Sequence, residues 1–101
     1  MRVISRKPLN DFATRYPAWK EAINEWWKKA EDADWNNFAD VRKTFNSVDA
    51  VGDSRYVFNI GGNNIRLVGM IFFKIHKLFV RGVFTHEEYD SLNASEKIKT
   101  L

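Results

Sequence analysis

The stretch from Ser54 to His86 constrains the fold most, because it contains no Asp or Glu and because apolar and polar residues alternate along it. Alternation with a period of two indicates β-strands that bury one face. The run Gly61-Gly62-Asn63-Asn64 interrupts the alternation and predicts a hairpin turn. The stretch therefore predicts a small antiparallel sheet whose charge has one sign, which is typical of a surface that binds anions.

The predicted turns also predict the pairing of the strands. The first turn pairs Ile60 with Ile65, Asn59 with Arg66, Val57 with Val68 and Arg55 with Met70. A two-residue second turn at Ile75-His76 pairs Met70 with Arg81, Val68 with Val83 and Arg66 with Thr85. One face of the sheet is then basic, and the other face is apolar and includes Leu78, Val80 and Phe84.

The N-terminal half predicts helices that cover the apolar face. Arg2 to Ser5 is expected to be a short strand. Helices are expected over residues 8–16, 17–32 and 38–45, where apolar side chains recur at helical spacing, and a loop is expected over residues 46–54. We therefore expect an α+β fold, a small and mostly antiparallel sheet with N-terminal helices on one face. One domain is expected over residues 1–101, with residues 91–101 as a tail or a short terminal helix.

Composition excludes several classes of protein. The absence of cysteine excludes disulfides, thiolate catalysis and cysteine-ligated zinc. Neither a signal peptide nor an apolar run of about 20 residues is visible, so we expect a cytoplasmic protein with no membrane partner.

Thr85-His86-Glu87-Glu88 fits a capping box, in which Thr starts a helix and Glu follows three residues later. His86 and Tyr89 then lie on one face of that helix, beside Arg66. Histidine is the side chain whose ordinary pKa suits proton transfer near pH 7, and a nearby arginine is expected to lower the pKa of Tyr89. Metal-free cleavage of a phosphodiester needs a base, an acid and cations on the phosphate, and His86, Tyr89, Arg66 and Arg81 supply them.

Other interpretations of these residues remain open. His86 can be a solvent-exposed residue of the first helical turn, and the strand arginines can simply solvate a sheet face. His76 is expected in an exposed turn, and Gly61-Gly62 in a hairpin turn. A metal site would use His86, Glu87, Glu88 and Asp90, but only His86 and Asp90 share a helical face, so no metal or other cofactor is expected.

Several motifs together resemble the HigB-type toxins of bacterial toxin-antitoxin systems, within the RelE superfamily. These motifs are Val57-Phe58-Asn59-Ile60-Gly61-Gly62-Asn63, Arg66-Leu67-Val68, Arg81 with Thr85-His86-Glu87-Glu88-Tyr89-Asp90, Ala33-Asp34-Trp35 and Ala39-Asp40-Val41. The resemblance implies a RelE-like fold and a metal-free endoribonuclease that cleaves mRNA on the ribosome, by attack of a ribose 2′-hydroxyl on its own phosphate. It also implies neutralisation by a helix-turn-helix antitoxin, HigA, through which the toxin reaches operator DNA.

By position, Arg66 and Arg81 are similar to the strand arginines of the superfamily, Tyr89 to its C-terminal aromatic residue, and His86 to the histidine of HigB-like members. Arg55, Asn59, Lys74 and Lys77 are expected to bind RNA. The chain lacks the lysines that many RelE relatives carry before the second strand, so His86 is the candidate general base. Two alternatives are a non-catalytic module that binds RNA or the ribosome, and a protein-interaction domain that docks an acidic partner.

Overall fold

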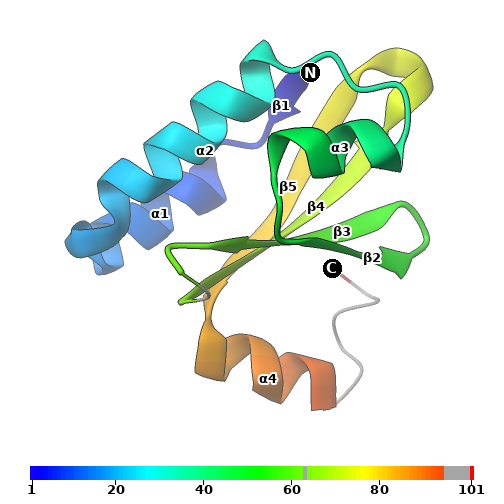
Figure 1. Cartoon of the computed structure of the whole chain (residues 1–101). Helices are drawn as coiled ribbons and strands as arrows, with labels where there is room; N and C mark the ends of the chain where they lie inside the picture. Colours follow the sequence, from blue (N-terminus) through cyan, green and yellow to red (C-terminus); the bar gives the residue numbers. More distant parts are fainter. Residues whose placement is uncertain (63, 95–100) are drawn as a thin grey trace.

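The structure, a computed structural model, describes residues 1–62, 64–94 and 101, and it has a five-stranded sheet at its centre. The strands are β1 (Arg2–Ile4), β2 (Val48–Gly52), β3 (Arg55–Ile60), β4 (Ile65–Phe72) and β5 (Lys77–Thr85), in the spatial order β1-β5-β4-β3-β2. Only β1 pairs in parallel, with β5. Helices α1, α2 and α3 cover one face of the sheet, and α4 lies on the other (Figure 1). The expected α+β fold is confirmed.

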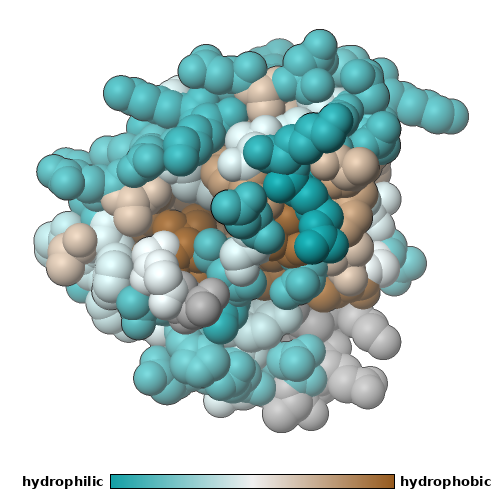
Figure 2. Space-filling view, viewed as in Figure 1, coloured by the Kyte–Doolittle hydropathy of each residue, from teal (hydrophilic) through white to brown (hydrophobic). Residues whose placement is uncertain are grey.

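The N-terminal helices form close to where their patterns predict them. Helix α1 (Lys7–Arg15) has Pro8 in its first turn, where the missing N–H of proline costs nothing. A 3₁₀ turn, η1 (Pro17–Trp19), leads into α2 (Lys20–Asp32). Helix α3 (Phe38–Thr44) is capped by the Asn37 side chain, which accepts a hydrogen bond from the Asp40 N–H at 3.0 Å. Their outer surfaces are mainly hydrophilic, and apolar atoms are visible where the helices meet the sheet (Figure 2).

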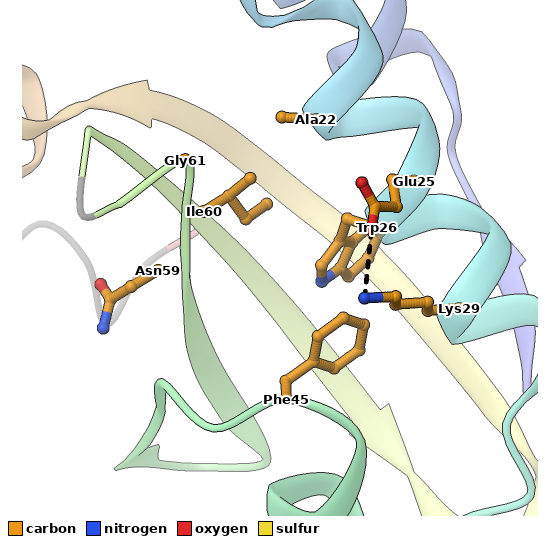
Figure 3. A pocket seen from close by; sticks show the side chains of 8 residues that line it. All are labelled: Ala22, Glu25, Trp26, Lys29, Phe45, Asn59, Ile60 and Gly61. Atoms are coloured by element: carbon orange, nitrogen blue, oxygen red, sulfur yellow. Dashed lines mark ion pairs between the residues drawn. The ribbon is translucent and has the colours of Figure 1, made fainter.

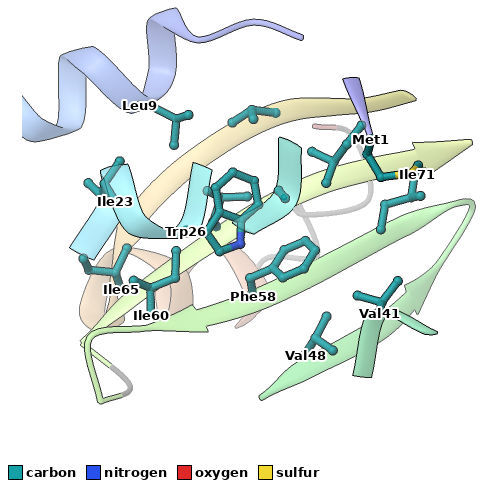
Figure 4. Close-up of a cluster of buried hydrophobic side chains, with 14 of the residues drawn as sticks. Met1, Leu9, Ile23, Trp26, Val41, Val48, Phe58, Ile60, Ile65 and Ile71 are labelled. Atoms are coloured by element: carbon teal, nitrogen blue, oxygen red, sulfur yellow. The ribbon is translucent and has the colours of Figure 1, made fainter. Parts of the chain in front are cut away.

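Aromatic rings fill the core between the helices and the sheet. Trp26 of α2 packs edge-on against Phe58 of β3 with 5.3 Å between ring centroids, and Trp35 stacks on Phe58 at 6.5 Å. The indole Nε1 of Trp35 donates to Thr44 Oγ1 at 2.9 Å, so this buried polar atom is satisfied. Aliphatic side chains such as Leu9, Ile23 and Ile65 surround the rings (Figure 4). This core packs against the face of the sheet that α1, α2 and α3 cover.

The loop expected over residues 46–54 is wrong, because Val48–Gly52 forms the edge strand β2. It pairs antiparallel with β3, with Val48 opposite Phe58 and Asp49 opposite Val57, and its ladder is irregular between Ala50 and Gly52. Such a short edge strand has one neighbour, so its residues need not be apolar. The sheet is therefore one strand wider than the sequence predicts at this edge.

The first predicted hairpin is confirmed residue by residue. Ile60 pairs with Ile65, Asn59 with Arg66, Val57 with Val68 and Arg55 with Met70. Gly61 and Gly62 both have φ of +62°, a left-handed conformation that glycine adopts without strain.

The second turn lies where it was predicted, with His76 exposed in it, but the predicted length of two residues is wrong. The connection is a 3₁₀ turn, η2 (Phe73–Ile75), closed by His76 with φ of +52°, and Phe72 pairs with Lys77. Met70 therefore lies opposite Phe79 instead of Arg81. A bulge between Val80 and Gly82 then shifts the register by one, so that Val68 pairs with Gly82 and Arg66 with Phe84.

The bulge changes which side chains reach each face of β5. Val83 packs into the core under the helices, whereas it was expected beside Val57 and Val68 on the other face. Phe84 takes that place and packs against Val57 and Val68, although it was expected under the helices. Tyr89 of α4 and Leu101 pack against the same two valines, so a second, smaller apolar cluster lies under α4.

Candidate active site

The start of α4 (His86–Ala94) is built by the predicted capping box. The Glu88 N–H donates to Thr85 Oγ1 at 3.3 Å, and the Thr85 N–H donates to the Glu88 carboxylate at 2.9 Å. The His86 N–H donates to the Asn64 carbonyl at 3.1 Å, which ties the helix start to the β3–β4 hairpin. The expected tail therefore begins as helix up to Ala94, and residues 95–100 of that prediction lie outside the described residues.

His86 lies between Arg66 and Asp90. Its Nδ1 is 3.3 Å from the guanidinium Nη2 of Arg66, and its Nε2 is 3.4 Å from the Asp90 carboxylate. A guanidinium only donates hydrogen bonds, so Nδ1 accepts in this contact and the ring proton lies on Nε2, toward Asp90. One ring nitrogen of His86 thus faces an arginine and the other faces a carboxylate. The sequence predicts the proximity of His86 and Arg66, and Asp90 is an addition to the predicted set.

Tyr89 lies beside this group on the inner side of α4, against Val57 and Val68. Burial raises the pKa of the Tyr89 hydroxyl above its ordinary value of 10.0, the carboxylates of Asp49 and Asp90 raise it further, and Arg66 opposes them by lowering it. The expectation that arginine lowers this pKa is wrong in its net direction, since desolvation is the largest effect. The Tyr89 hydroxyl therefore keeps its proton at neutral pH.

Asp49 is a residue of this region that sequence analysis missed. It is exposed on β2 opposite Val57, and its charge acts on the Tyr89 hydroxyl. No pattern in the sequence assigns Asp49 to a strand, because β2 forms by pairing with β3 and not through a local sequence signal. The basic face consequently carries an acidic residue at its β2 edge.

Arg81 does not lie in the row expected for it. It is the extra residue of the β5 bulge and has no partner on β4. It is exposed, and it lines a cavity of about 360 Å³ together with Asp11 and Arg15 of α1 and with Phe84. Arg81 therefore occupies the edge of the sheet beside α1, while Arg66 contacts His86 directly.

Arg55 and Asn59 lie on the face of the sheet that α4 covers. The Arg55 guanidinium donates two hydrogen bonds to the main-chain oxygen of Leu101, at 3.1 and 2.8 Å. The Asn59 side chain donates to Ser47 Oγ at 2.7 Å. Both residues are thus ordered by local contacts, and their predicted part in RNA binding stays a prediction.

Lys74 and Lys77 lie at the other end of the sheet, around the β4–β5 connection. Arg66 and Phe72 are six residues apart on β4, which corresponds to roughly 20 Å along a strand. His76 lies in the same connection, half exposed, with its Nδ1 3.2 Å from the Asp34 carboxylate. The two lysines are far from His86, and their predicted contact with RNA stays a prediction.

A cavity of about 280 Å³ opens on the opposite face, between α2 and the end of β3 (Figure 3). Its rim carries an ion pair between Glu25 and Lys29 at 3.2 Å, and Trp26, Phe45 and Ile60 form apolar walls. The Trp26 Nε1 is buried there without a hydrogen-bond partner among the described residues. The residues that line this cavity include no histidine, whereas the α4 side carries His86.

The predicted metal alternative is not assembled in the described ranges 1–62, 64–94 and 101, where no three His, Asp or Glu residues gather as a metal site would need. The Glu88 carboxylate caps its own helix, and Asp90 contacts His86. The same ranges contain no helix that is long and apolar enough to cross a bilayer.

Comparison with known families decides what kind of protein carries this arrangement. Residues 19–92 match the family HigB_toxin, described as the RelE-like toxic component of a toxin-antitoxin system. The chain belongs to the HigB toxin family. The match spans α2 to α4 and so includes Arg66, His86, Tyr89 and Asp90. The resemblance inferred from the motifs is confirmed.

Individual HigB relatives are similar over almost their whole length. The protein of Escherichia coli (strain K12) named mRNA interferase toxin HigB is 35% identical over 101 residues, which cover 98% of this chain and 97% of the relative. The mRNA interferase HigB of Shigella flexneri has the same identity and coverage. The mRNA interferase HigB of Escherichia coli O6:H1 (strain CFT073) is 30% identical over 94 residues, or 91% of each chain.

Proposed function

We propose that the chain is an mRNA interferase, an endoribonuclease that cleaves mRNA on the ribosome without a metal ion and so stops translation. The observation that carries the proposal is the contact series from Arg66 through His86 to Asp90, beside Tyr89. These side chains supply a base, an acid and a phosphate-binding cation on one face of the sheet. The names of the relatives favour the same activity.

Arg66 and His86 act in sequence in this mechanism. The guanidinium binds the scissile phosphate with two parallel hydrogen bonds, a geometry that suits arginine. Binding the phosphate draws Arg66 away from Nδ1 of His86, which frees the lone pair that Arg66 now holds. His86 then takes the proton of the ribose 2′-hydroxyl as that oxygen attacks the neighbouring phosphorus. Asp90 keeps the opposite ring proton in place and stabilises the imidazolium that forms.

Tyr89 completes the reaction as the general acid. The new bond joins the 2′-oxygen to phosphorus, and the bond from phosphorus to the 5′-oxygen breaks. The leaving 5′-oxygen takes the phenolic proton, which Tyr89 retains at neutral pH because burial raises its pKa. The products are a 2′,3′-cyclic phosphate and a free 5′-hydroxyl, and His86 returns its proton to Tyr89 through solvent.

Binding of the RNA involves the wider basic surface. Arg55 and Asn59 lie on the same sheet face as Arg66 and are proposed to contact the RNA backbone, and Arg81 adds charge at the β5 edge. The protein works in the bacterial cytoplasm on ribosome-bound mRNA. Its partner is a HigA antitoxin with a helix-turn-helix domain, which neutralises it and links it to operator DNA.

The test is cleavage of a reporter mRNA in a purified translation system, mapped by primer extension. The toxin is first treated with EDTA, which is then removed so that the ribosomes keep their magnesium. We expect wild-type cuts that survive this treatment, and a loss of about 100-fold or more in His86→Ala and Arg66→Ala. Lys28→Ala on the outer side of α2 is the matched control and keeps full activity.

Two results would reject the proposed chemistry. Wild-type protein that folds but cuts no mRNA in the presence of translating ribosomes leaves a non-catalytic ribosome-binding module. Cleavage by His86→Ala at the wild-type rate removes His86 as the base. End-group analysis is decisive for the mechanism, because a cleavage product with a 5′-phosphate is incompatible with attack by the 2′-hydroxyl.

A further inference from the structure

The described residues, 1–62, 64–94 and 101, leave an apolar surface exposed at the end of the sheet opposite α4. We call it the distal surface, and it consists of Met70, Phe72, Ile75 and Phe79. Neither apolar cluster of the described residues contains any of these four side chains. The β4–β5 connection that carries the distal surface and helix α4 lie at opposite ends of the molecule (Figure 1).

Exposure singles out this surface from the rest of the described chain. Ile75 is 57% exposed and Phe72 is 36% exposed, and these two are the exposed large apolar side chains of residues 1–62, 64–94 and 101. Phe72 lies edge-on to Phe79 with 5.7 Å between ring centroids, so the aromatic part is preformed. Isolated apolar residues on a surface are ordinary, but neighbouring ones with a cavity beside them mark an interaction site.

Such a cavity is present. It has a volume of about 480 Å³ and is lined by Phe72, Phe73 and Ile75, by Ser54 from the turn between β2 and β3, and by Asn36 before α3. Phe73 forms the inner wall, held by an edge-on contact with Tyr56 at 6.0 Å. The cavity is large enough for one bulky apolar side chain of a partner.

The charged residues around the distal surface indicate what kind of partner segment would bind there. Lys74 lines the cavity, and Lys77 and Arg2 lie next to each other across the β1–β5 pair. The acidic residues of this end are Asp53, in the turn between β2 and β3, and three whose carboxylates are engaged in local contacts. Asp34 contacts His76, Asp40 accepts a hydrogen bond from the Asn36 N–H, and Glu31 accepts one from the Val3 N–H. In the part of the chain that the structure describes, neither lysine forms an ion pair. A segment that is acidic and carries apolar anchors complements this surface.

We propose that the distal surface binds an acidic segment of the cognate antitoxin, with an apolar side chain of that segment in the cavity lined by Phe72 and Ile75. The inference rests on membership in a toxin-antitoxin family, and it adds the docking surface and the chemistry of the partner. Binding there leaves the antitoxin anchored roughly 20 Å along β4 from Arg66. Ile75, which is more exposed than Phe72, is aliphatic and offers a base no flat ring to stack on, and this favours protein over RNA.

The experiment is calorimetric titration of the purified toxin with its purified cognate antitoxin. We expect Ile75→Glu and Phe72→Ser each to weaken binding by about tenfold or more, as loss of a central anchor does. Lys74→Glu is expected to weaken binding and to reduce its dependence on salt. Lys28→Glu is the matched charge reversal on α2 and binds as the wild type does. Because the first two substitutions alter exposed side chains, circular dichroism is expected to show a native fold.

The same variants separate this proposal from the catalytic one. Ile75→Glu is expected to cleave mRNA normally and to escape neutralisation, whereas His86→Ala is expected to be inactive and to bind the antitoxin fully. Wild-type affinity in both Ile75→Glu and Phe72→Ser would overturn the proposal. So would a loss of RNA cleavage with unchanged antitoxin affinity, which assigns the surface to RNA or the ribosome. If the toxin forms a dimer that Ile75→Glu dissociates, and the affinity for the antitoxin is unchanged, the distal surface serves self-association instead.

Discussion

The cap of α4 can be removed without touching the side chains proposed to act on RNA. In Thr85→Ala the Glu88 N–H loses its acceptor, the Thr85 Oγ1 at 3.3 Å, and the first turn of α4 is left with an unpaired donor. Replacing a threonine cap with alanine costs about 1 kcal/mol, which corresponds to roughly a fivefold increase in the population of the open helix. His86 leads this helix, so its contact with Arg66 is lost in the open state.

Hydrogen exchange of the α4 amides is the direct assay. We expect the amides of residues 87–90 to exchange roughly five times faster in Thr85→Ala than in Thr85→Ser, because these two variants differ only in the hydroxyl that caps the helix. RNA cleavage is expected to fall by a comparable or smaller factor, while the amides of β3 and β4 keep their protection. Equal exchange in the Ala and Ser variants would refute the idea that the cap holds the site together.

Three further predictions follow from the same region. Because the pKa of Tyr89 is raised in the folded state, the stability that this residue contributes is present below pH 10 and is lost as the pH rises above that value. Between pH 9 and 11 the melting temperature of Tyr89→Phe is therefore expected to fall less than that of the wild type. Asp49→Asn removes a charge that raises this pKa, so ultraviolet titration is expected to find it lowered. In Gly82→Ala the new Cβ would lie 2.5 Å from the Phe84 ring, and urea unfolding is expected to report a loss of about 1–3 kcal/mol.

The first hairpin and the capping box were predictable because their signals are local. Glycine in the left-handed conformation sets the turn after Ile60, and the whole ladder between β3 and β4 then follows from the period of two. The cap needs only Thr85 and Glu88, three residues apart. Those two features bring Arg66 and His86 together, so the centre of the candidate site could be derived from sequence.

The wrong predictions for β2, the second turn and β5 have causes that do not appear in the local sequence pattern. Strand β2 forms because β3 offers it a free edge, and its own sequence, Val-Asp-Ala-Val-Gly, has no strong alternation. The second turn holds His76 in a left-handed conformation that is usually adopted by glycine or asparagine, so the sequence did not reveal how long this turn is. The bulge adds one residue to β5, and one residue is enough to exchange faces for Val83 and Phe84. Arg81 was misplaced for that reason.

The bulge also leaves one residue of β5, Arg81, without a partner in the pairing with β4. If Arg81 were deleted, Val80 and Gly82 would become consecutive and would face Gly69 and Val68, which are already consecutive on β4. Every other pair along the strand would keep its partner, so the ladder can accommodate the loss of this residue but not the loss of any neighbour within the paired segments. Pairing of the strands therefore places little demand on which residue stands at this position, while the α4 site stays in register with the core.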